Sequence, residues 1–274
     1  SQIDADRMDY LLRDSYFTGT NYGTFDLTRI LRVMKPYADG ISFDMSGMHA
    51  AEDYIVSRFQ MYQQVYFHPV SRSIEVILSH LLKRAKYLYK NGKTNCLGPT
   101  NLLFPFFEDN FSLSDYLKLD DGVLNSYFSL WQDSDDKILS DLADRFLNRK
   151  PFKSVRVSED TRYLLPTLRK LVADAGFDSE YYTATNDSFD LPYDTYSPSQ
   201  NKHRTQIELM QKDGLLVELS QVSNLVAAIS GKVSGDERFF FPKEMKSSEQ
   251  QLELFGPIYS EFQSYLKNDT LIKK

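Results

Sequence analysis

The chain opens with a dense run of charged, apolar and aromatic residues, Gln2-Ile3-Asp4-Ala5-Asp6-Arg7-Met8-Asp9-Tyr10-Leu11-Leu12-Arg13-Asp14. Within it, Met8, Leu11 and Leu12 recur at helical spacing, which predicts a helix over residues 4–16. Gly19 and Gly23 mark the loop that follows. Because chain termini are usually loose and dispensable, so informative a start predicts that the sequence is a fragment of a longer protein.

One face of this predicted helix collects groups suited to sugars and phosphates. With about 3.6 residues per turn, Asp6, Tyr10 and Asp14 fall within about 80° of one another. Arg7 lies at the edge of the same face. A guanidinium matches phosphate oxygens, a carboxylate suits a hard cation or a sugar hydroxyl, and a phenol can both stack and hydrogen-bond.

A second predicted helix repeats this geometry. Arg58, Tyr62 and Tyr66 are spaced i, i+4, i+8, so that a base or sugar could pack on the tyrosines while the arginine reaches a phosphate. His68, just before Pro69, is a candidate metal ligand.

Both groups also have a plainer interpretation. The first helix could face solvent, with its charges paired locally, as Asp9 and Arg13 are spaced to do. The tyrosines could form a buried aromatic seam, and His68 could simply be hydrogen-bonded. Helical spacing by itself favours these alternatives.

The remaining pattern predicts a mainly helical region over residues 1–150 and a smaller α+β lobe with antiparallel strands over 151–274. Further helices are expected over 26–34, 48–90 with a kink at Pro69, 113–130 and 135–148, besides a short strand over 41–45. The lobe is expected to contain strands over 152–157, 181–185 and 238–242 and helices over 159–175, 222–230 and 248–267. Between 205–210 and 215–219, the Asp213-Gly214 pair predicts a β-hairpin, because it supplies the positive-φ turn that suits strand twist.

Composition excludes several classes of function. The 274 residues carry a formal charge of -6, which argues against general nucleic-acid binding but leaves room for a local nucleotide pocket. Cys96 is the single cysteine, so no intrachain disulfide can form and a cytoplasmic location is expected. No apolar run approaches the roughly 20 residues that cross a bilayer.

Standard catalytic motifs are missing from the sequence. It contains no P-loop, no GxGxxG and no GxSxG elbow. His49, His80 and His203 are scattered, without an HxxxH or HExxH pair, so a complete zinc site within the chain is not expected.

Three segments together resemble the HD-domain superfamily of deoxynucleoside triphosphate (dNTP) triphosphohydrolases, in particular bacterial members related to the animal enzyme. Residues 2–14, followed by Gly19, resemble the family's last metal-ligand segment. Residues 58–68 resemble its helix R-x-x-[LM]-[HY]-x-x-[VA]-Y-x-H, and residues 119–124 resemble an L-x-D segment. The resemblance implies that residues 1–150 are the C-terminal part of an HD-type helical catalytic domain.

Carried over position by position, the resemblance implies that Asp6 ligates a catalytic divalent metal ion. It implies a substrate-binding set of Arg7, Tyr10, Asp14, Arg58, Tyr62 and Tyr66. Within that set the arginines would bind the triphosphate. Asp14 would receive the 3′-hydroxyl of the deoxyribose, and Tyr66 would pack where a 2′-hydroxyl would clash. Tyr62 stands where some relatives have a histidine.

The resemblance also implies partners. Many relatives are tetramers activated by a nucleotide bound between subunits, and Arg29 and His68 match positions that line this regulatory site. Gln64 and Pro69 depart from the basic residues of the animal enzyme.

The family holds its metal with a His, a His-Asp pair and a distant Asp, and only the distant Asp matches here. By itself the chain is therefore expected to be inactive, because one carboxylate cannot fix a divalent ion firmly enough to activate water. In the intact protein, dNTPs would be hydrolysed to deoxynucleoside and inorganic triphosphate. Two alternatives stay open: an HD phosphohydrolase for another nucleotide, and a non-catalytic regulatory or assembly module.

Overall fold

The computed structural model describes residues 2–38, 40–190, 193, 206–231, 234–246 and 256–273. The chain forms two compact units, each built from two segments. Unit 1 comprises Ser1–His68 and Ser188–Gly235, and unit 2 comprises Pro69–Asp187 and Asp236–Lys274. Residue 150, the predicted boundary, lies inside unit 2; as a division into functional domains it stays a prediction. None of the helices in the described part of the chain is long and apolar enough to span a membrane.

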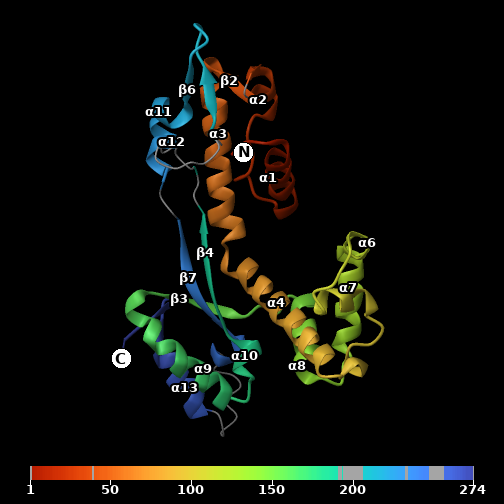
Figure 1. Cartoon of the computed structure of the whole chain (residues 1–274). Coiled ribbons are helices and arrows are strands. Elements are labelled where there is room, and N and C mark those ends of the chain that lie inside the picture. Colours follow the sequence, from red (N-terminus) through yellow and green to blue (C-terminus); the bar gives the residue numbers. More distant parts are fainter. Residues whose placement is uncertain are drawn as a thin grey trace. The chain divides into compact units, whose positions relative to one another are not determined.

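The helices of unit 1 are α1 (Ala5–Thr18), α2 (Leu27–Val33) and α3 (Met48–Met61), besides the short α11 (Leu219–Val222) and α12 (Asn224–Ile229). Figure 1 shows α1 and α2 on one side of α3, with α11 and α12 on the other. Asp4 caps the start of α1 by accepting a hydrogen bond from the Arg7 amide. Gly19 ends it in the left-handed conformation (φ 70°), which glycine adopts without a steric penalty.

Unit 1 also contains a four-stranded sheet with the order β1 (Met34–Tyr37), β2 (Gly40–Asp44), β5 (Glu208–Met210) and β6 (Leu216–Glu218). β5 and β6 form the predicted hairpin, which is confirmed, and β2 pairs with β5 in parallel. Residues 1–150 are mainly helical, as predicted, and the strand expected over 41–45 is present as β2, whereas β1 was not predicted. Two strands of that region join a sheet whose other half comes from far along the chain, and local periodicity carries no signal for such a pairing.

The predicted helix over 48–90 is interrupted. α3 ends at Met61, a π-helical turn, η2, covers Tyr62–Tyr66, and α4 runs over Pro69–Lys90. In η2 the Phe67 amide donates to the Tyr62 carbonyl at 2.8 Å, one residue further back than in an α-helix. The helix is thus interrupted just before Pro69, which begins α4.

Unit 2 packs helices against a five-stranded sheet. Its helices are α4, α5 (Phe104–Phe107), α6 (Leu113–Tyr116), α7 (Asp121–Gln132), α8 (Lys137–Leu147), α9 (Leu165–Asp174), α10 (Ser179–Tyr182) and α13 (Gly256–Ser264). The strand order is β4 (Ala184–Asp190), β7 (Ser234–Phe241), β3 (Lys153–Val157), β9 (Thr270–Leu271) and β8 (Leu266–Lys267). The core includes Trp131, fully buried, whose indole donates to the Leu97 carbonyl at 3.0 Å.

Helices with antiparallel-rich sheets confirm the predicted fold class, while three predicted boundaries move. The helix expected over 113–130 is split into α6 and α7, because Asp120 caps a new helix. The strand expected from residue 181 begins at Ala184, after α10. Of the helix expected over 248–267, residues 248–255 lie outside the described residues, and α13 gives way to β8 at Leu266.

Candidate nucleotide site on α1, α3 and η2

The candidate site rests on tight packing between α1 and α3. Met8 and Leu11 of α1 share a buried cluster with Tyr54, Ile55 and Met61 of α3. The returning loop passes so close that a Cβ on Gly23 would lie 2.6 Å from the Leu11 carbonyl oxygen and about 3 Å from Met61. This contact requires glycine, and it anchors the two helices whose polar faces carry the predicted site residues.

The two faces meet through an aspartate and a tyrosine that lie 52 residues apart in the sequence. Tyr66 donates a hydrogen bond from its hydroxyl to Oδ2 of Asp14 at 2.7 Å. The Tyr10 ring lies edge-on to Tyr66 with 6.3 Å between ring centroids, and Tyr62 contacts Tyr66 in the same manner at 5.0 Å. The structure thus brings together Tyr10 and Asp14 from the first predicted group with Tyr62 and Tyr66 from the second.

The π-helical turn determines how these tyrosines are presented. The extra residue in one turn rotates Tyr66 relative to Arg58, so the i, i+4, i+8 spacing no longer describes a regular stripe. Tyr62, Tyr66 and Asp14 are all partly exposed. The interpretation of the tyrosines as a buried aromatic seam therefore describes their contacts but not their accessibility.

Burial and hydrogen bonding keep the tyrosines protonated. The pKa of Tyr10 is raised to about 12, mainly by burial and further by the hydrogen bond with Tyr62 and the charge of Tyr62. The positive charges of Arg58 and Arg7 act in the opposite direction. Burial, then the hydrogen bond to the Asp14 carboxylate, raises the pKa of Tyr66. Near neutral pH the phenols of Tyr10 and Tyr66 are therefore neutral hydrogen-bond donors.

Arg58 supplies a buried positive charge beside the tyrosines. Arg58 is 6% exposed, and its guanidinium carbon lies 5.0 Å from the centre of the Tyr62 ring. Stacking of this kind holds the planar guanidinium in one orientation. Arg7 is half-exposed, with its Nε 3.7 Å from Oδ2 of Asp4.

Sequence reasoning missed one member of this cluster, Tyr54. It stands one turn before Arg58, fully buried, and donates to the Gln2 carbonyl at 3.0 Å. Burial raises the pKa of Tyr54, and the charges of Arg58 and Arg7 lower it. Extending the four-residue spacing of Arg58, Tyr62 and Tyr66 backwards by one step would have found it.

The other predicted residues lie outside this cluster. Asp6 is exposed in the first turn of α1. Arg29, on α2, donates to the Ser46 carbonyl at 3.0 Å, and His68 is exposed after η2. As the plainer interpretation of α1 expected, Asp9 and Arg13 form an ion pair.

The donor set does not fit a metal ion. Within the described residues, no group of three or more His, Cys, Asp or Glu side chains could hold one. A single carboxylate such as Asp6 falls short of the three protein ligands typical of a catalytic site.

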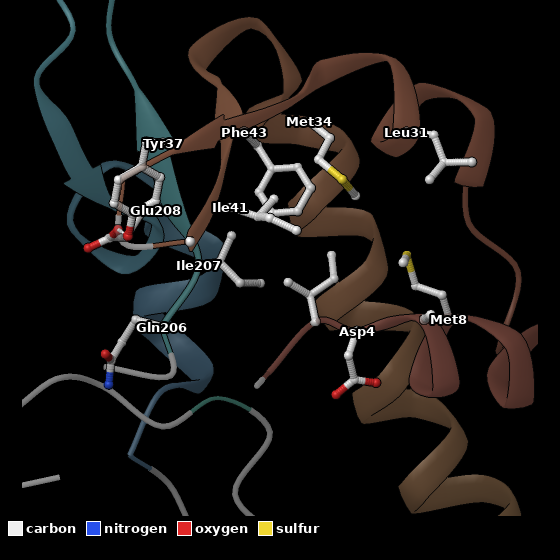
Figure 2. A pocket seen from close by; sticks show the side chains of 13 residues that line it. Asp4, Met8, Leu31, Met34, Tyr37, Ile41, Phe43, Gln206, Ile207 and Glu208 are labelled. Carbon is white, nitrogen blue, oxygen red and sulfur yellow. Dashed lines mark hydrogen bonds between the residues drawn. The ribbon is translucent and has the colours of Figure 1, made fainter. Parts of the chain in front are cut away.

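A separate cavity of about 600 Å³ lies where the start of α1 approaches the sheet of unit 1. Figure 2 shows the apolar side chains of Met8, Met34, Phe43 and Ile207 pointing toward one another around it, with Asp4 and Glu208 among the lining residues. None of the predicted site residues lines this cavity. The tyrosine cluster and the cavity are thus two different features of unit 1.

Comparisons with known proteins agree with part of the resemblance. Residues 25–95 match the family described as HD associated region. The uncharacterized protein YwfO of Bacillus subtilis is 48% identical over 248 residues, which cover 89% of this chain and 57% of YwfO. The deoxynucleoside triphosphate triphosphohydrolase SAMHD1 homolog of Dictyostelium discoideum is 29% identical over 90 residues, or 33% of this chain and 17% of that protein.

Among solved structures, a phosphohydrolase from Bacteroides thetaiotaomicron superposes with a TM-score of 0.71 and 26% identity, over 88% of this chain and 61% of its own. The chain spans little more than half the length of YwfO and of this phosphohydrolase. In sequence and structure, the chain is similar to HD-type phosphohydrolases.

Proposed function

We propose that this chain supplies the sugar- and phosphate-binding part of a dNTP triphosphohydrolase site within a longer protein. The observation that carries the proposal is the Asp14–Tyr66 hydrogen bond, flanked by the rings of Tyr10 and Tyr62. The similarity to a SAMHD1 homolog supports the choice of dNTPs over other nucleotides.

The sugar would be recognised by Asp14 and Tyr66. A carboxylate offers about four acceptor positions, and Tyr66 occupies one, so Asp14 can still accept from a 3′-hydroxyl. The Tyr66 ring is held by that same bond and by its edge contacts with Tyr10 and Tyr62. A ribonucleotide would press its 2′-hydroxyl against this ring. The hydroxyl would then lose its hydrogen bonds to water without forming a new one, which disfavours ribonucleotides.

The triphosphate would be bound by Arg58 and Arg7. Arg58 is buried and stacked on Tyr62, so little side-chain freedom is left to lose on binding. A guanidinium in such a setting interacts more strongly with phosphate charge than it would in water. The same charge would stabilise the additional negative charge that develops on the phosphate during hydrolysis.

The reaction would join water to the α-phosphorus as the bond to the 5′-oxygen breaks, with a proton passing to that oxygen. The products are deoxynucleoside and inorganic triphosphate. Among the described residues, no group of side chains suffices for the metal that such a reaction requires, so Asp6 would be one ligand among several. Arg29 and His68 would contact an activating nucleotide in a tetramer.

The substrate class can be tested with the full-length protein by measuring release of inorganic triphosphate from dGTP and from GTP. We expect dGTP to be the better substrate by about tenfold or more, the range in which an unpaired hydroxyl is rejected. Equal rates would remove the role assigned to Tyr66.

The role of Asp6 can be tested with a control from the same helix. Asp6→Ala should abolish turnover and weaken metal binding in the full-length protein. Asp9→Ala removes another exposed carboxylate of the same helix, one that is engaged with Arg13, and should leave turnover within about twofold. Comparable losses in both variants would show that Asp6 has no specific part.

A further inference from the structure

In unit 2, strand pairing places two arginines directly opposite each other. β3 and β7 are antiparallel, and Arg156 pairs with Arg238 in their register. Side chains of directly opposed residues project from the same face of a sheet, about 5 Å apart. Two like charges in this position repel each other and destabilise the sheet unless an anion lies between them.

A third arginine reaches the same place from α4. Arg72, whose side chain is 1% exposed, bonds to both the carboxylate and the backbone carbonyl of Asp236. It also donates from Nε to the side chain of Asn186 at 2.9 Å, and its guanidinium lies over the Phe240 ring. Arg72 is therefore fully engaged and holds Asp236 in place.

All three arginines rely on Asp236. Its Oδ2 lies 3.0 Å from Nε of Arg156 and 2.9 Å from Nε of Arg238, while Oδ1 faces Arg72. Three guanidinium groups and one carboxylate leave an excess of two positive charges at this point. Two nearby carboxylates are engaged elsewhere among the described residues: Glu237 pairs with Arg162, and Asp269 pairs with Lys246.

Arg238 and Arg156 differ in how far their guanidinium groups are buried. Nε of Arg238 is buried and lies 2.9 Å from Oδ2 of Asp236, in an ion pair. Nη1 of Arg238 donates to the Ser154 hydroxyl at 3.2 Å. The Arg156 side chain is 63% exposed, and the outer edge of its guanidinium faces solvent beside the buried Arg238. Burial, together with the charges of Arg156 and Arg72, lowers the pKa of Arg238 despite the opposing effect of Asp236.

We propose that Arg156 and Arg238 form a binding site for a phosphate-type oxyanion on this face of the unit 2 sheet, with Arg72 and Asp236 as its support. A tetrahedral anion would bridge the two guanidinium groups, neutralise the excess charge and relieve the cross-strand repulsion. Among the described residues, Asp236 balances one of the three charges. The site is independent of the nucleotide site proposed in unit 1.

Binding can be measured by calorimetry on the full-length protein with inorganic phosphate, tripolyphosphate and dGTP as probes, and acetate as a reference anion at equal ionic strength. We expect phosphate to bind at least about tenfold more tightly than acetate, because it can accept from both arginines at once. The probe whose affinity falls most in the Arg156→Gln variant identifies the source of the anion at this site: free phosphate, a polyphosphate or a nucleotide.

Arg156→Gln should weaken phosphate binding about tenfold. Arg162→Gln is the matched control, because Arg162 is also 63% exposed and ion-paired with a carboxylate of β7, and it should leave the affinity unchanged. The proposal is overturned if Arg156→Gln and Arg162→Gln bind phosphate equally, or if phosphate binds no better than acetate.

Discussion

The same hydrogen bond occurs in both units with different surroundings. In unit 1 Tyr66 donates to Asp14 at 2.7 Å, and in unit 2 Tyr182 donates to Asp141 at 2.7 Å. In unit 2 the same oxygen of Asp141, Oδ2, also accepts a hydrogen bond from Nε of Arg145 at 2.7 Å. For the Asp14 carboxylate, Tyr66 is the one hydrogen-bond donor found among the described residues.

The difference separates a structural network from a candidate binding site. Arg145, 5% exposed, also bonds to Glu244 at 2.9 Å and lies over the rings of Phe152 and Tyr182. Its charge is thus matched inside the protein. Asp14 is partly exposed and keeps acceptor capacity beside Tyr66, so unit 1 presents an acceptor group to a ligand. A tyrosine–aspartate bond is therefore informative only together with what else reaches the carboxylate.

The largest expected effect is on the stability of unit 2. Arg145→Ala would leave Asp141 and Glu244 without their shared cation, and breaking a buried ion pair from one side costs about 3–5 kcal/mol. Denaturant unfolding of the full-length protein should show this loss. A free energy of unfolding within about 1 kcal/mol of the wild type would mean that the network is not structural.

Asp14→Asn is expected to have the next largest effect, and on activity. Loss of the carboxylate charge weakens hydrogen bonds to the sugar and to Tyr66, and a bond to a charged group contributes about 1.5–3 kcal/mol, or roughly tenfold to a hundredfold in kcat/KM for dGTP. The free energy of unfolding should change by about 1 kcal/mol or less, because Asp14 is partly exposed. A large loss of stability with intact turnover would place Asp14 with the structural network.

A matched pair of tyrosine variants sharpens the comparison further. Tyr66→Phe should reduce the preference for dGTP over GTP several-fold, because the ring loses the bond that orients it. Tyr182→Phe should leave that preference unchanged and lower the free energy of unfolding by about 1 kcal/mol. Rates with both nucleotides, beside denaturant curves, check both expectations. Identical profiles for the two variants would contradict the difference between the units.

The smallest effect concerns alkaline pH. The pKa of Tyr10 is about 12 in the folded protein, above the ordinary value of 10.0, so between these pH values the folded state retains a proton that the unfolded state has lost. This contribution to stability is complete below pH 10 and is lost as the pH rises toward 12. When tyrosine ionisation is followed by absorbance as the pH rises, the Tyr10→Phe variant should lack the ionisation of one tyrosine near pH 12. Loss of a step near pH 10 would indicate that Tyr10 is not held by its neighbours.

Much of the fold could be predicted because the relevant signals are local. Asp26 caps α2, as expected of Asp before an apolar helix. The Asp213-Gly214 turn places Gly214 at φ 84° within the predicted hairpin. The sheet of unit 1 escaped prediction, because β2 and β5 pair across more than 160 residues of sequence and both strands are short.

By itself, the sequence determined which residues share a helical face, since spacing along a helix is a local property: Asp6, Tyr10 and Asp14 on one helix, and Arg58, Tyr62 and Tyr66 on another. Tertiary structure alone decided that Tyr66 meets Asp14, that a π-helical turn redirects the tyrosines, and that Tyr54 joins them behind Arg58. The reason is physical. A hydrogen bond between residues 52 positions apart depends on how two helices pack, and that packing is determined by buried contacts such as Gly23 against Leu11 and Met61.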